Sequence, residues 1–238
     1  MNQTKLLSGV LLAASLPAGA ATITQDFNAG FANGGTVADG NLVPWSDTRP
    51  IMGAPGETIT SVLVKLYVAG GYNGDLYGYL SYGGQTVPLL NRVGVGSGDA
   101  FGYADAGLYV TFNDAASDDI HFYQNVGGWT IANGAAWQPD GRLVNPVTGL
   151  PAEFDALGTR KLSVWNGADP TGDWTLVLSD VVLGGGAATV QSWGLQITTA
   201  PVPEPGTWAM LVVTAGGVCG HWLRPRRRGR SGQPPRRS

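Results

Sequence analysis

The sequence predicts an all-β fold for the middle of the chain, an antiparallel β-sandwich or jelly roll. Apolar and polar residues alternate in four runs, Val62–Val68, Leu108–Phe112, Trp174–Leu178 and Trp193–Ile197, as expected for strands with one buried face. No helical pattern longer than about ten residues occurs between residues 21 and 200. Turn-forming residues separate the runs. The turn signals are Asn73-Gly74, Gly83-Gly84, Gly94–Gly98, Asn113-Asp114, Gly127-Gly128, Asn166-Gly167 and Gly184–Gly186.

Composition supports a folded domain with many turns. Of the 238 residues, 37 are Gly and 15 are Pro, and only 13% are charged, which does not match a helix-rich cytosolic protein. Hydrophobic residues make up 43% of the chain, too many for a disordered protein. The single cysteine, Cys219, lies outside the central domain. That domain therefore has neither a disulfide nor a cysteine metal site, and core burial must stabilise it.

The first 20 residues have the features of an export signal. Lys5 supplies a positive charge, Leu6–Leu16 is an apolar run, and Ala18 and Ala20 place small residues where a signal peptidase cleaves. We predict a signal peptide over residues 1–20, with cleavage after Ala20. The alternative interpretation, a short buried helix, is disfavoured by the proline that directly precedes the small residues.

Several segments of the central domain, residues 21–200, resemble in order the P domain of proprotein convertases, also called P/Homo B. The best match covers residues 58–198. The matching segments are Ile59–Val68, Asn73–Leu76, Leu89–Asn91, Val110–Ala116, Leu162–Gly167, Gly172–Asp180 and Ser192–Leu195. The resemblance implies a non-catalytic β-sandwich of the kind that accompanies proteases. Two departures are the segment Tyr82–Thr86, where the family has a Ser-Pro-x-Gly-Thr turn, and an apparent insertion, Leu143–Arg160. No subtilisin-like catalytic domain is present in this sequence.

The central domain carries no sequence motif for catalysis. Its only histidine is His121, and it contains no Gly-x-Ser-x-Gly, His-Glu-x-x-His or phosphate-loop pattern. Paired carboxylates could hydrolyse glycosides, but the sequence does not give their separation. We therefore predict a protein that is not an enzyme, in which His121 has a structural role.

Calcium is the cofactor that the sequence allows, although no certain cofactor is predicted. Several aspartates lie in glycine-rich loops, and calcium prefers oxygen ligands. Asp75 and Asp114 are the best candidates because they lie in segments that match the P domain. The alternative interpretation is that these aspartates only form turns. The other loop aspartates are Asp99, Asp105, Asp118 and Asp119.

Tyrosines concentrate around the first predicted hairpin, where their rings could stack on sugars. Tyr77 and Tyr79 share one strand face and are the predicted pair, whereas the alternative is that the rings fill the core. The five tyrosines of this region are Tyr67, Tyr72, Tyr77, Tyr79 and Tyr82.

The charges are distributed unevenly. Residues 21–202 hold 6 basic and 16 acidic residues, a net charge of −10, whereas seven arginines and no acid follow residue 205. Residues 207–223 are apolar and long enough to span a membrane, and the arginines that follow favour a cytoplasmic tail, residues 224–238. An exported protein meets little nucleic acid, so we predict no nucleic-acid partner. The residues that would stop transfer in the cytoplasm are Arg224, Arg226, Arg227 and Arg228.

Pro203, Glu204 and Pro205, followed by the apolar span and the arginine cluster, resemble the PEP-CTERM sorting signal of Gram-negative bacteria. The resemblance covers the sorting segment, residues 201–238. It implies processing by an exosortase, a membrane-embedded transpeptidase, and an association with exopolysaccharide and biofilm. The precursor is then expected in the inner membrane with a periplasmic domain, and the product at the outer surface or in the extracellular matrix.

The sequence predicts an exported surface or matrix module without enzymatic activity. Its expected partners are the exosortase and the membrane before processing, and then exopolysaccharide or a separate protease. Two alternatives stay open: an accessory P-like domain that assists a separate subtilisin-like protease, and a calcium-dependent carbohydrate-binding module.

Overall fold

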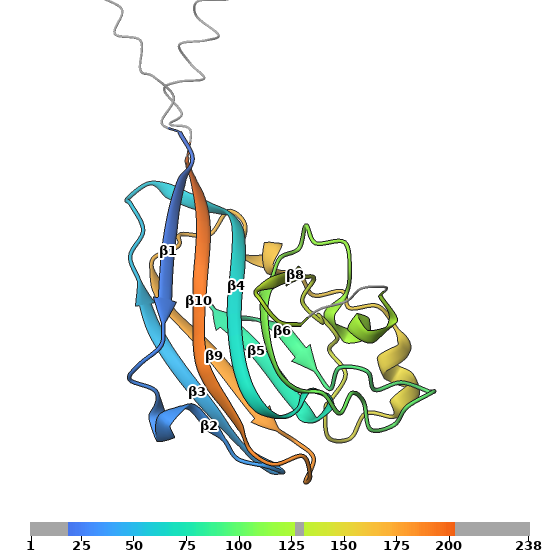
Figure 1. The fold of residues 1–238 in the computed structure, drawn as a ribbon. Helices are drawn as coiled ribbons and strands as arrows, with labels where there is room; N and C mark the ends of the chain where they lie inside the picture. Colours follow the sequence, from blue (N-terminus) through green and yellow to red (C-terminus); the bar gives the residue numbers. More distant parts are fainter. Residues whose placement is uncertain (1–18, 127–130, 203–238) are drawn as a thin grey trace, which may run out of the picture. The chain divides into compact units, whose positions relative to one another are not determined.

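The computed structural model describes residues 19–126 and 131–202, which form two β-sheets that face each other (Figure 1). The predicted all-β fold is thereby confirmed. Ala20 is an exposed residue directly before the first strand. The first of the chain's two units ends at Pro201. Outside the described residues lie the predicted signal peptide up to Ala18, the sorting motif Pro203–Pro205, the predicted span 207–223 and the tail 224–238.

The first sheet has the strand order β1-β10-β4-β7-β8, and the short strand β2 pairs with β10. All its neighbours are antiparallel except β7 and β8, which are parallel. Its strands are β1 (Ala21–Phe27), β2 (Thr36–Val37), β4 (Glu57–Tyr72), β7 (Ala106–Phe112), β8 (Ala135–Trp137) and β10 (Ala188–Pro201).

The second sheet has the order β3-β9-β5-β6 and is antiparallel throughout. With the short strands β2 and β8 set aside, the chain passes between the two sheets in the order of a jelly roll, in which only the consecutive strands β5 and β6 share a sheet. The strands of this sheet are β3 (Asn41–Ile51), β5 (Leu76–Tyr82), β6 (Gln85–Asn91) and β9 (Gly172–Asp180).

The helical segments of the described residues are 3-10 turns of three to six residues, in agreement with the expectation that the domain has no long helix. None of these described segments has the length and apolar character needed to cross a bilayer. They are η1 (Ala32–Gly35), η2 (Asn73–Asp75), η3 (Ile120–Asn125), η4 (Pro151–Asp155) and η5 (Leu162–Trp165).

The core lies between the two sheets and follows the predicted alternation. In β4, Val64 and Leu66 are fully buried, whereas Lys65 and Tyr67, which each follow one of them, lie on the outer face. Trp174 and Trp193, from the other predicted runs, are among the largest buried side chains. Burial of such side chains is the main stabilising contribution in a domain without disulfides.

The turn between β5 and β6 determines the geometry of the hairpin. Tyr82 pairs with Gln85, which leaves a two-residue loop. Gly83 and Gly84 have φ angles of +56° and +75°, as a type I′ turn requires. The predicted turn therefore sets the register of this hairpin.

Candidate functional site

Two tyrosines lie side by side on the outer face of the first sheet. Tyr67 of β4 is directly opposite Tyr109 of β7, and their ring centroids are 5.4 Å apart. The two residues are 42% and 41% exposed. Successive side chains of a strand point to opposite faces, so these tyrosines point outward while their neighbours along each strand point into the core. The buried neighbours are Leu66, Val68, Leu108 and Val110. The sheet thus presents two aromatic rings to solvent on a rigid support.

A hollow of about 460 Å³ borders this tyrosine pair, and both rings contribute to its lining. Its volume lies in the range typical of small-molecule sites. Part of the wall is backbone at Gly107, which has a φ angle of +75°. A Cβ at Gly107 would lie 2.7 Å from the carbonyl oxygen of Val68, so this part of the wall requires glycine.

Asp105 is one of the residues that line the same hollow. Its Oδ2 accepts hydrogen bonds from the Tyr123 hydroxyl, at 2.8 Å, and from the side-chain amide of Gln124. Burial raises the pKa of Tyr123, and the hydrogen bond to Asp105 adds to this, so the hydroxyl remains a donor at neutral pH. Among the ion pairs of the described residues, none neutralises Asp105. Two neutral donors therefore orient the carboxylate.

Further polar groups surround the tyrosine pair on the outer face. Ser192 of β10 is paired with Tyr67, and Thr111 of β7 is paired with Lys65. The Lys65 ammonium lies 3.1 Å from Oδ1 of Asp26 in an exposed ion pair. The face therefore combines aromatic rings with hydrogen-bonding groups of both kinds.

The tyrosines singled out from the sequence have different roles in the structure. Tyr77 and Tyr79 do form a pair, with ring centroids 5.7 Å apart, but both are only partly exposed on β5, and burial raises the pKa of Tyr77. Tyr82 stacks on Trp174 at 4.0 Å and donates its hydroxyl to the carbonyl of Thr171. Tyr82 therefore anchors the edge of the core. Tyr109, which the sequence analysis did not select, completes the more exposed pair.

The two predicted calcium ligands have separate environments. Asp114 accepts hydrogen bonds from the backbone N–H groups of Leu162 and Ser163, at 2.9 and 2.8 Å. Both of its oxygens are thus used to hold η5. Asp75 is 6% exposed, and burial raises its pKa while the nearby Arg92 opposes this effect.

Asp180, the last residue of β9, is a neighbour of Asp75 that the sequence analysis did not select. It is fully buried, and its Oδ2 has no hydrogen-bond partner. Burial and the charges of Asp75 and Asp39 raise the pKa of Asp180 to about 6. Hydrogen bonds from two backbone N–H groups oppose this increase in the pKa. In the part of the chain that the structure describes, no three His, Cys, Asp or Glu side chains are placed to hold one metal ion. Calcium binding stays a prediction.

Most of the other loop aspartates accept local hydrogen bonds, in line with the alternative interpretation for them. Asp99 accepts from the backbone N–H groups of Phe101 and Gly102, and Asp118 accepts from the hydroxyl of Ser117. Asp119 begins η3 by accepting from the His121 N–H. These contacts are typical of turn and capping residues.

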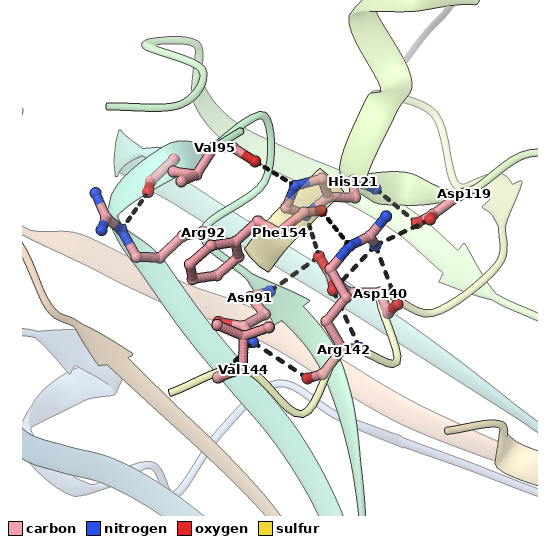
Figure 2. Close-up of polar contacts among 10 residues, drawn as sticks. Asn91, Arg92, Val95, Asp119, His121, Asp140, Arg142, Val144 and Phe154 are labelled. Atoms are coloured by element: carbon pink, nitrogen blue, oxygen red, sulfur yellow. Dashed lines mark hydrogen bonds and ion pairs between the residues drawn. The ribbon is translucent and has the colours of Figure 1, made fainter. Parts of the chain in front are cut away.

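A buried polar cluster surrounds His121 (Figure 2). Nδ1 of His121 lies 2.6 Å from Oδ2 of Asp140, and Nε2 lies 2.8 Å from the carbonyl oxygen of Val95. The side chains of His121 and Asp140 are both 0% exposed. Both ring nitrogens therefore lie within hydrogen-bond distance of an oxygen atom inside the cluster. The His121 ring is therefore enclosed within the polar cluster.

Arg142 connects this cluster to the predicted insertion. Its Nη1 lies 2.9 Å from Asp119 Oδ2 and 3.2 Å from Asp140 Oδ1, and its Nε donates to the carbonyl of Phe154 at 2.9 Å. The Asn91 amide donates to the carbonyls of Arg142 and Val144. Figure 2 shows these groups converging from separate segments of the chain. The cluster therefore fixes the start and the middle of the insertion to the sandwich.

The insertion also forms a second concave surface, with a hollow of about 530 Å³. Leu143 and Leu157 line this hollow and are 69% and 74% exposed. Val147 and Leu150, in the same segment, are also exposed. The insertion thus concentrates apolar side chains at the surface.

The solved structures that are similar to this chain include two from Aeromonas sobria. One is the serine protease of Aeromonas sobria (ASP) in complex with its chaperone (ORF2), with 15% identity and a TM-score of 0.43 over 79% of this chain and 28% of that one. The other is the serine protease of Aeromonas sobria, with 14% identity and a TM-score of 0.38 over 76% and 27% of the two chains. This chain thus spans about a quarter of their length.

No protein-family model and no curated protein matches the chain. The likeness to the two protease structures concerns the arrangement of the backbone alone. The functional proposals below rest on the residues of this chain.

Proposed function

We propose that this chain is an exported, non-catalytic surface module that binds polysaccharide through the outer face of β4 and β7. The observation that carries the proposal is the tyrosine pair Tyr67–Tyr109, which stands exposed beside a hollow of about 460 Å³. A sugar ring has an apolar face of C–H groups, which an exposed aromatic ring can cover while its edge stays hydrated. Two rings on adjacent strands offer a platform for successive sugars of a chain.

Polar groups around the platform support a sugar ligand over a purely apolar one. Asp105 accepts hydrogen bonds, Lys65 donates them, and Ser192 and Thr111 can do both. Binding sites of this kind combine an apolar surface with a few fixed polar groups that determine orientation. The face therefore offers both donors and acceptors to the hydroxyl groups of a sugar.

Export and sorting complete the proposal. The signal sequence before Ala21 and the acidic composition of the domain suit an exported protein. The sorting segment would hold the precursor in the inner membrane until an exosortase acts at Pro203–Pro205. The released domain would then reach the outer surface or the matrix and bind exopolysaccharide there.

Replacing Tyr67 and Tyr109 together by Ala is expected to weaken binding to the organism's own exopolysaccharide about thirtyfold. This follows if each ring contributes about 1 kcal/mol by stacking. The folded state is expected to persist, since both side chains are exposed. The measurement is the dissociation constant from affinity electrophoresis in gels that contain the polysaccharide.

Two matched variants make this result specific. The double variant Tyr67→Phe and Tyr109→Phe keeps both rings and is expected to bind within a few-fold of the wild type. Replacing Tyr77 and Tyr79 by Ala tests the pair suggested by the sequence. Loss of binding in that variant, with full binding after the Tyr67 and Tyr109 substitutions, would place the site on β5 and contradict our proposal.

Replacing Pro203, Glu204 and Pro205 together by Ala is expected to leave export intact and to block release of the domain. An apolar span inserts almost irreversibly, so release from the membrane requires a covalent cut. The measurement is the mass and the cellular location of the domain in wild-type and mutant cells. If both proteins lose the arginine-rich tail equally, or if neither does, processing at this motif is wrong and the segment is a permanent anchor.

A further inference from the structure

We propose that the polysaccharide recognised by the Tyr67–Tyr109 face is cationic, a polymer of hexosamines whose amines are not acylated. This inference rests on the proposed function and names its ligand class. It starts from Asp105, a residue that lines the same hollow as both tyrosines. A binding surface that pairs aromatic rings with a negative charge is complementary to a sugar that carries a positive one.

The environment of Asp105 keeps the carboxylate available. Its hydrogen-bond donors are the neutral groups of Tyr123 and Gln124, both of which bind Oδ2. Lysine and arginine ion pairs in the described part of the chain are formed by Arg49, Lys65 and Arg142, and all of them use other carboxylates. A ligand ammonium group would therefore supply the positive partner that Asp105 lacks.

The spacing suits a short stretch of a polymer. Asp105 and Tyr109 are four residues apart on or beside β7, so they are separated by at most about 13 Å along the strand. That distance corresponds to a few linked sugars. A chain that stacks on the tyrosine pair can thus bring the amine of a neighbouring unit to Asp105.

The charge of the whole domain disfavours the opposite class of polymer. With 16 acidic and 6 basic residues between residues 21 and 202, the domain carries a net charge of −10. Polymers of uronic acids are repelled by such a surface, whereas cationic polymers are concentrated near it. Neutral polysaccharides gain the stacking and hydrogen-bonding contributions but no ionic attraction. The expected order of affinity is cationic, then neutral, then anionic.

The test is isothermal titration calorimetry of the purified domain, residues 21–202, with three soluble oligosaccharides of equal length. These are a glucosamine oligomer with free amines, its N-acetylated form and a uronic acid oligomer. Circular dichroism first establishes that this fragment is folded. We expect tight, salt-sensitive binding of the free-amine oligomer, weaker and salt-insensitive binding of the N-acetylated form, and no binding of the uronic acid.

Asp105→Asn gives the residue-level test. It is expected to weaken binding of the free-amine oligomer about fivefold, the effect of losing one exposed ion pair, and to leave the N-acetylated form unaffected. Asp173→Asn, which removes the same charge from an exposed position on β9, is the matched control and is expected to change neither affinity.

The outcomes separate this inference from the proposed function. One outcome is that the free-amine and N-acetylated oligomers bind with equal affinity, that Asp105→Asn changes neither affinity, and that removing the two tyrosine rings abolishes both. This outcome would overturn the cationic ligand but keep the polysaccharide site. If Asp105→Asn and Asp173→Asn weaken binding of the free-amine oligomer equally, the preference for a cationic ligand comes from the net charge of the domain. That result would overturn the role of Asp105. No binding of any oligomer or of exopolysaccharide by the folded domain would overturn both proposals.

Discussion

Replacement of Asp140 by Asn is expected to lower the free energy of unfolding by about 3–5 kcal/mol, the usual cost of removing one partner from a buried ion pair. Asp140 is 0% exposed and accepts hydrogen bonds from the side chain of His121, from the backbone of Asn91 and from both the backbone and the guanidinium of Arg142. An asparagine keeps one oxygen that can accept hydrogen bonds. Its NH₂ group replaces the other oxygen and would then face groups that are themselves donors. The buried cluster also loses one of the two carboxylates that pair with Arg142.

The measurement is urea denaturation, in which the midpoint should fall while the slope stays constant. Asp26→Asn is the control, because it makes the same change in the exposed pair with Lys65, where the side chains are 60% and 36% exposed. That variant is expected to lose less than about 1 kcal/mol. If Asp140→Asn is no more destabilising than Asp26→Asn, the cluster does not hold the insertion to the sandwich.

Replacement of Asp180 by Asn is expected to raise the stability at pH 7 by up to about 3 kcal/mol, given its raised pKa. The pKa of Asp180 is about 6 in the folded protein, whereas an unfolded aspartate titrates near pH 3.9, an approximate reference value. Between these values the folded state binds the proton more strongly, so the stability of the wild type falls as the pH rises from about 4 to about 6. Asparagine stays neutral and removes this contribution.

The measurement is the free energy of unfolding from pH 4 to pH 7 in the presence of a chelator, because a bound cation would stabilise the ionised carboxylate. The gain from Asp180→Asn should be largest at pH 7 and disappear towards pH 4. Some pH dependence of the same sign should remain, since the pKa of Asp75 is also raised. Asp173→Asn, on the same strand but exposed, should follow the wild type. A gain that does not vary with pH would contradict the assignment.

The sequence predicted the fold best where a strand has one fully buried face. The alternation in β4, β7, β9 and β10 is strong because each of these strands has neighbours on both sides. The edge strands β1 and β3 were missed. In β1 only Ile23 and Phe27 pack against the core, and β3 contains Pro44 and Pro50, which are tolerated because an edge strand leaves backbone donors unused.

The candidate site depended on information that the sequence does not contain. Alternation alone places Tyr67 and Tyr109 on outer faces, but only the pairing of β4 with β7 brings their rings together. The resemblance to the P domain drew attention to Asp75 and Asp114 instead, and the structure uses Asp114 to hold η5. The hairpin tyrosines were selected by their proximity in sequence, which does not show that Tyr82 stacks on Trp174.

The buried cluster was only partly predictable. The structural role expected for His121 agrees with its complete burial. Its partners Asp140 and Arg142 were not selected. They lie about twenty residues along the chain, directly before the insertion 143–160, where the sequence has no strand periodicity. Asp119, a calcium candidate in the sequence, forms an ion pair with Arg142 instead. Such contacts follow from tertiary packing and not from local pattern.

The most direct test of the polysaccharide site is to map it by NMR, through chemical-shift changes in the folded domain when a soluble fragment of the organism's exopolysaccharide is added. The ring resonances of Tyr67 and Tyr109 and the amides of residues 105–109 should shift, while Tyr77, Tyr79 and the insertion 143–160 should not. Shifts confined to β5 or to the insertion, or no shifts at saturating ligand, would show that the outer face of β4 and β7 is not the binding site.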